Sequence, residues 1–199
     1  MKRRVLLGGA AASLAGCSVL PERPYQERRE WPLEVRRPTT GVPGPHAPVL
    51  LLRALRAGPG LDTRGLRTRL ADGAERIDNW EEWAVLPPQG VDECMRQWLA
   101  ASGLFSAVVM PGSQVTAEFV LEGELVAFVG DQPAGVSRVG LSLVLLRATG
   151  TGRFLPVLQR SLAGQAPLTG IGGPALAASM QAALASLLTS VEATLAPSV

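Results

Sequence analysis

The chain alternates apolar and polar residues over two long stretches, and this pattern predicts strands. Residues 117–129 and 138–147 each place apolar side chains at every second position, which is typical of a strand with one buried face. Residues 131–135 contain proline and glycine and join the two stretches as a hairpin. Residues 154–162 predict a third antiparallel strand. Pro156 predicts an edge or a bulge at its start, because proline has no amide hydrogen to donate.

Two other segments have the period of amphipathic helices. The first runs from Pro87 to about Ser102, and the second runs from Pro174 to about Leu195. The second helix is rich in alanine, which allows close packing on a sheet, and its serine, threonine and glutamate residues argue against a membrane span. The predicted buried residues are Val91, Cys94, Met95, Trp98 and Leu99 on the first helix, and Leu176, Met180, Leu184, Leu187, Leu188, Val191 and Leu195 on the second.

Shorter strands are predicted in the first half of the chain. Residues 31–37 and 49–52 are candidate strands, and residues 38–48 between them form a loop rich in proline and glycine. Residues 66–70 predict an edge strand, with residues 75–78 as the second arm of a hairpin. The complete pattern predicts an α+β fold, in which a mostly antiparallel sheet is covered by two helices in a single domain.

The N-terminal residues predict export and lipidation. Residues 14–17 read Leu-Ala-Gly-Cys, after a basic start in residues 1–4 and a short apolar run that ends at Gly16. These are the parts of a secretory signal peptide, and a cleavage site directly before a cysteine resembles a bacterial lipobox. Cys17 is therefore the predicted lipidated residue, modified with fatty acyl chains such as palmitate. An ordinary signal peptide with a chance cysteine is the alternative.

This interpretation divides the chain into three parts. Residues 1–16 are the predicted signal peptide, residues 17–30 a lipidated polar tether, and residues 31–199 the folded domain. Acyl chains anchor a protein to a membrane surface without a spanning helix. Ser18 stands where some bacteria use aspartate to retain lipoproteins in the inner membrane. The prediction is therefore the outer membrane, on its periplasmic face, with the inner membrane as the alternative.

Charge and composition argue against nucleic-acid binding. The chain has 19 basic and 17 acidic residues, but three of the basic ones lie in the predicted signal peptide, which leaves 16 against 17. The remaining basic residues are all arginines and are scattered among acids, so no basic stripe forms.

Residues that support catalysis or metal binding are scarce. His46 is the only histidine, in a proline-rich loop, and Cys94 lies on the predicted apolar face of a helix. One histidine and one thiol cannot make a four-ligand zinc site, and a Ser-His-Asp triad would depend on His46 alone. Glu122 and Glu124 share the solvent face of a strand. The sequence predicts no enzyme activity, no cofactor and no metal, and a lipoprotein hydrolase is the least favoured class.

The order of three short motifs resembles a known family. The motifs are GLDTRGLRTR at residues 60–69, NWEEWAVLPP at 79–88 and LAASGLFSAVV at 99–109, after a lipobox and before a hairpin and a C-terminal helix. This order is similar to that of the ABC-type transport auxiliary lipoproteins, which include PqiC-like proteins.

The resemblance implies a role in transport. Such lipoproteins accompany an ABC permease and ATPase and a periplasmic protein with an MCE domain, in systems that move phospholipids or other hydrophobic molecules between membranes. They resemble docking components without chemistry of their own. Some form rings, so a homo-oligomer is left open. An envelope assembly or structural lipoprotein that is not tied to a transporter is the alternative function.

Residue type suggests where such a protein contacts its partner. Tryptophan and arginine are enriched at interface hot spots. The candidate partner-binding residues are therefore Arg67, Arg69, Trp80, Glu82 and Trp83. The alternative for Trp80 and Trp83 is that they cap the core.

Overall fold

The computed structural model describes residues 25–150 and 152–199. The predicted signal peptide and Cys17 lie outside the described residues. Within them the chain forms one mixed sheet of nine strands with two helices, which confirms the predicted α+β class.

Three long antiparallel strands form the main part of the sheet. They are β7 (Phe119–Asp131), β8 (Val136–Ala148) and β9 (Phe154–Pro167), and they follow one another in sequence and in space. Among the described strands β9 pairs only with β8, so it forms an edge of the sheet. Leu145 pairs with Leu158 whereas Leu146 pairs with Pro156, so one extra residue of β9 makes a bulge there. This confirms the prediction for Pro156.

The other edge of β7 is shared by three short strands placed end to end. All three run parallel to β7, so the sheet is mixed even though its long pairings are antiparallel. Further strands extend the sheet beyond the first and third of them. The short strands are β2 (Val49–Leu52), β3 (Arg56–Ala57) and β4 (Gly65–Arg69), with β6 (Ala107–Val109) beside β2, and β5 (Glu75–Trp83) and then β1 (Arg29–Trp31) beyond β4.

Two predictions for the first half of the chain were wrong in part. β4 forms the predicted hairpin with β5, but it lies between β5 and β7 and is not an edge. Only Trp31 of the predicted strand 31–37 belongs to a strand, and β1 begins at Arg29. The rest of that segment turns away from the sheet because its polar groups contact the helices, where the amide of Glu34 donates to Gln181 Oε1 (3.4 Å).

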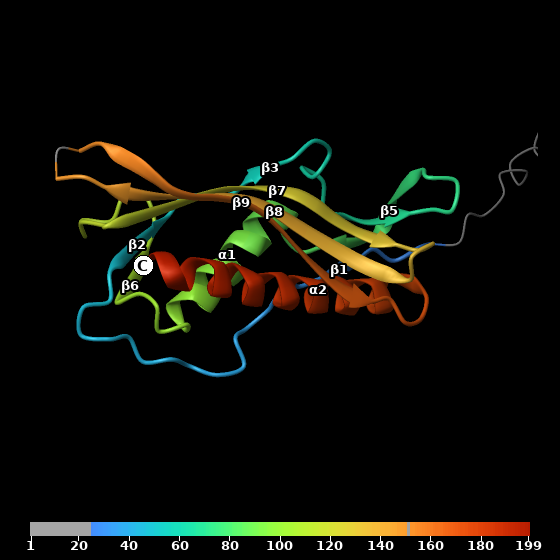
Figure 1. Ribbon diagram of the computed structural model, residues 1–199. Helices are drawn as coiled ribbons and strands as arrows, with labels where there is room; N and C mark the ends of the chain where they lie inside the picture. Colours follow the sequence, from blue (N-terminus) through green and yellow to red (C-terminus); the bar gives the residue numbers. More distant parts are fainter. Residues whose placement is uncertain (1–24, 151) are drawn as a thin grey trace, which may run out of the picture.

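Both helices cover the same face of the sheet (Figure 1). They are α1 (Pro87–Ala100) and α2 (Gly172–Leu195), and the short 3₁₀ turn η2 (Ala196–Ser198) follows α2. All the predicted helix core residues are buried, among them Trp98 and Leu184. Residues 172–198 are long and apolar enough to cross a membrane by composition. In this domain the apolar side chains of α2 instead form the core against β8 and β9.

The domain is elongated and has two distinct ends. At the first, Arg29 of β1 pairs with Glu81 of β5, whose carboxylate lies against Gly173 at the start of α2. We call this the tether end. The far end holds the C-terminal residues beside Ala148, the loop 110–117 and the turn between β8 and β9. α2 has 24 residues, so the ends are separated by about 36 Å at the usual helical rise. Figure 1 shows β1 and the C-terminus on opposite sides.

Candidate partner-binding surfaces

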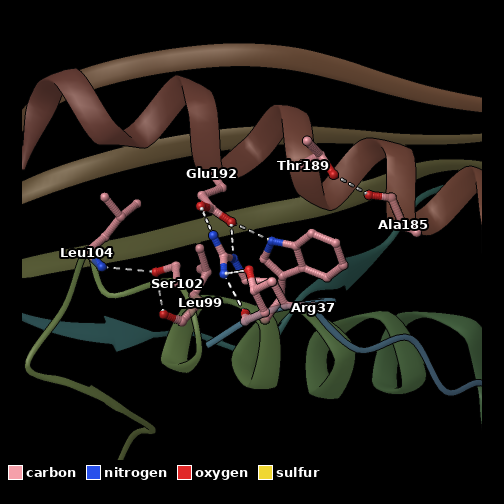
Figure 2. Close-up of polar contacts among 9 residues, drawn as sticks. Arg37, Leu99, Ser102, Leu104, Ala185, Thr189 and Glu192 are labelled. Carbon is pink, nitrogen blue, oxygen red and sulfur yellow. Dashed lines mark hydrogen bonds and ion pairs between the residues drawn. The ribbon is translucent and has the colours of Figure 1, made fainter. Parts of the chain in front are cut away.

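A polar cluster joins α1, α2 and the segment between β1 and β2. Glu192 of α2 accepts hydrogen bonds from Arg37 (Nε, 2.9 Å; Nη2, 3.1 Å) and from Trp98 Nε1 of α1 (2.8 Å). Figure 2 shows Arg37 reaching up to Glu192 from the segment before β2. The Arg37 guanidinium lowers the pKa of Glu192 below its usual value, with a smaller contribution from Trp98. The cluster fastens the segment after β1 to both helices, so its role is structural.

The predicted residues Arg67 and Arg69 lie side by side on β4 and are paired within the domain. Both contact Glu75 of β5, at 2.8 Å and 3.2 Å, and Arg69 also lies 3.9 Å from Asp131 of β7. Hydrogen bonds from Arg67, and then from Arg69, lower the pKa of Glu75. Both guanidinium groups therefore join the two strands of the hairpin, and Arg69 also holds it against β7. The Arg69 side chain is 43% exposed, whereas that of Arg67 is only 15% exposed.

Glu82 is the centre of a second ion-pair group. Its carboxylate lies 2.6 Å from Arg64 and 3.6 Å from Arg28, and Arg64 also lies 3.5 Å from Glu30. Glu82 is 8% exposed, so its charge is mostly directed to these arginines. The group ties the start of β1 to the hairpin at the tether end.

The two predicted tryptophans differ sharply in exposure. Trp80 is 42% exposed and is available on the surface. Trp83 is 1% exposed and packs against Phe128, with ring centroids 5.3 Å apart. Trp83 therefore belongs to the core, the alternative role weighed for it, and its ring does not contribute to the described surface.

The candidate chemical groups lie apart from one another. His46 is exposed in the loop before β2. Cys94 is buried, its Sγ donates to the carbonyl oxygen of Leu33 (3.5 Å), and burial raises the pKa of its thiol. Glu122 forms an ion pair with Arg53, and Glu124 lies 3.6 Å from Arg56. Among the described residues, no three His, Cys, Asp or Glu side chains gather as they would to hold a metal ion.

One surface was missed by the sequence interpretation. The far end carries an apolar hollow between the loop 110–117 and the start of β9. The sequence signal was present, since Phe154 is an apolar residue at the start of a strand that was predicted to begin at an edge. The hollow was not found because its walls come from β2, the loop 110–117, β7 and the turn between β8 and β9, which meet only in the fold.

Comparison with known proteins identifies the family. The family model for the ABC-type transport auxiliary lipoprotein component matches residues 32–192. The chain belongs to this family. A comparison with curated proteins gives no significant match.

Solved structures share the fold of this auxiliary lipoprotein. A Xanthomonas campestris protein of the family DUF330 is 20% identical, with a TM-score of 0.69 over 85% of this chain and 95% of the other. A crystal structure of an uncharacterized protein is 13% identical, with a TM-score of 0.64 over 86% of this chain and 97% of the other. At these identities the likeness concerns the fold alone, and it shows that the sheet with two helices on one face recurs in other proteins.

Proposed function

We propose that this protein is an accessory outer-membrane lipoprotein of an ABC transporter of the MCE type, and that it acts by docking and not by catalysis. The observation that carries the proposal is the family match over residues 32–192. In this proposal Cys17 carries the lipid anchor, and the domain contacts the periplasmic MCE-domain subunit of a complex that also contains permease and ATPase.

The arrangement of polar groups supports docking over chemistry. A nucleophile needs a base within hydrogen-bond reach and a third group to orient that base. Cys94 lies on the buried face of α1 and its thiol donates to a backbone carbonyl, while the exposed His46 stands in a separate loop. Purified full-length protein should therefore show no esterase, glycosidase or peptidase turnover. Turnover that is lost on replacing His46 with alanine would overturn this part of the proposal.

The first candidate contact surface is formed by Arg67, Arg69, Trp80 and Glu82. Trp80 is 42% exposed and the Arg69 side chain 43% exposed, while Arg67 and the mostly buried Glu82 stabilise this surface through ion pairs. Replacing Trp80 and Arg69 together with alanine should leave the domain folded but weaken recovery of the MCE-domain subunit. Unchanged recovery would remove this surface from the proposal.

The test of the function is cross-linking in cells. The full chain, tagged at its C-terminus and expressed at its native level, is cross-linked and purified in detergent, and its partners are identified by mass spectrometry. We expect the MCE-domain subunit, with the permease and ATPase at lower yield. If wild-type cells give envelope assembly factors and no MCE protein, the alternative of an assembly lipoprotein takes its place.

A further inference from the structure

The far end of the domain carries an uncharged hollow of about 400 Å³. Leu51 and Val120 come from the face of the sheet opposite the helices, while Met110, Val115 and Phe154 stand around them. None of the described residues that line the hollow is charged. A site of this kind selects an apolar group, because a charged one would lose its hydration without finding a partner.

Exposed apolar side chains gather around this hollow. Met110, Val115 and Phe154 line the hollow and are 53%, 52% and 43% exposed. Apolar side chains that gather in this way mark an interaction site, whereas single exposed apolar residues are ordinary. The hollow and these three exposed side chains together are called the apolar tip.

The position of the apolar tip limits what covers it. The tether end holds β1, and Arg29 is 12 residues after Cys17, so a fully extended tether reaches about 42 Å. For the apolar tip to touch the membrane that holds Cys17, the tether would have to run nearly extended along the whole domain. A concave site at the opposite end from the tether instead fits a protein that approaches from the far side.

We infer that the apolar tip receives an uncharged, apolar protrusion of the periplasmic MCE-domain subunit. The inference rests on the proposed function and assigns the main contact to the end opposite the lipid anchor. The surface with Arg69 and Trp80, nearer the tether end, then makes a second and smaller contact with the same subunit.

Site-specific photo-cross-linking in cells tests the placement. Benzoylphenylalanine is introduced into the full chain at Phe154, at Met110, at Trp80 or at Val126. The last is a matched control, because it is an apolar residue of β7 that is 49% exposed but lies away from the hollow. We expect light-dependent adducts with the MCE-domain subunit at Phe154 and Met110 and none at Val126. Adducts at Trp80 without any at the tip overturn the inference.

A charge-insertion pair gives an independent measurement. Phe154→Glu together with Met110→Glu should reduce co-purified MCE-domain subunit about tenfold or more, the effect of losing an interface anchor. Val126→Glu should leave the recovery unchanged, and thermal melting should show that all variants are folded. Equal recovery from the tip variant and wild type contradicts the inference.

The remaining outcomes also decide between explanations. Adducts at the tip with a second copy of this chain alone, or with phospholipid alone, overturn the docking inference, because the tip would then be covered by self-association or by the bilayer. If wild-type protein recovers no MCE-domain subunit under any condition, the proposed function fails and the inference fails with it. If wild-type protein recovers the MCE-domain subunit but the tip positions give no adducts with it, the inference is rejected and the proposed function stands.

Discussion

Gly164 of β9 lies directly against the backbone of α2 near Ala183. A Cβ atom at this position would overlap the carbonyl oxygen of Ala183 and would lie 2.5 Å from the amide nitrogen of Leu187. Backbone atoms cannot rotate away as a side chain can, so even one methyl group would push the helix from the sheet. The absence of a side chain here lets the longest helix approach the sheet edge closely.

Gly164→Ala should therefore destabilise the domain, although alanine normally favours ordered backbone over glycine. Overpacking of a close contact costs about 1–3 kcal/mol, measured as a change in the free energy of unfolding by urea. Gly44→Ala is the matched control, since no atom lies within 4 Å of its added Cβ. A Gly164 variant as stable as the control would show that α2 has room to move.

Acid should weaken the contact between Arg37 and Glu192. Because Arg37 lowers the pKa of Glu192 in the folded state, the carboxylate contributes stability at neutral pH. This contribution is lost as the pH falls through the lowered pKa of Glu192, which lies below the ordinary value for glutamate. Glu192→Gln should therefore be less stable than wild type at pH 7, and the difference should shrink at pH 3, as measured by urea midpoints.

Glu93 provides the comparison for this pH effect. Arg96 also lowers the pKa of Glu93, but this pair lies within α1 and the Glu93 side chain is 49% exposed. Exposed helix pairs contribute about 0.3–0.5 kcal/mol. Glu93→Gln should change the midpoint little at either pH, and an equal pH dependence for both variants would contradict the structural role of Glu192.

Trp98 should be one of the costliest residues to truncate. Its ring is 4% exposed in the core and its Nε1 donates to Glu192. Trp98→Ala should lower the free energy of unfolding by about 3–5 kcal/mol. Trp80→Ala, at a position that is 42% exposed, should lower it by less than about 1 kcal/mol. A loss at Trp98 no larger than that at Trp80 would show that the ring is not packed.

Cys17 should determine membrane attachment. Cys17→Ala removes the sulfur that accepts the lipid, so the variant should remain an unprocessed precursor or become soluble. Cell fractionation and electrophoretic mobility measure the change, and density-gradient separation of wild-type membranes distinguishes outer from inner membrane. Wild-type fractionation and mobility in the variant would reject lipidation at this residue.

Local periodicity was sufficient to predict the long strands and both helices, because each buries one face over many residues. The position of β4 could not be read in the same way. β4 pairs with β7, where Thr68 of β4 lies opposite Gly130 of β7, and these residues are far apart in sequence. The alternation of apolar and polar residues within one strand does not indicate which distant strand lies beside it. The segment after β1 was mistaken for a strand because Leu33 and Val35 alternate and are buried, but they pack without pairing in the sheet.

The candidate surface was predicted in composition but not in orientation. Trp80 and Trp83 are three residues apart in one strand, and a register irregularity in the β4–β5 pairing lies beside them. Asp78 accepts hydrogen bonds from the amides of Trp80 (2.8 Å) and Glu81 (3.0 Å) at this point. An irregularity of this kind changes which residues face the core, and it depends on the partner strand as much as on the local sequence.

The bulge at Pro156 has a consequence for how densely the protein can be packed on a membrane. A 14-residue strand with one unpaired edge is a template for the edge of a neighbouring molecule, and anchoring to a surface raises the local concentration of such neighbours. Proline cannot donate to an added strand, the bulge interrupts its register, and the long charged side chain of Arg160 stands exposed farther along. β9 is therefore a poor seed for sheet-to-sheet aggregation, even in a crowded layer.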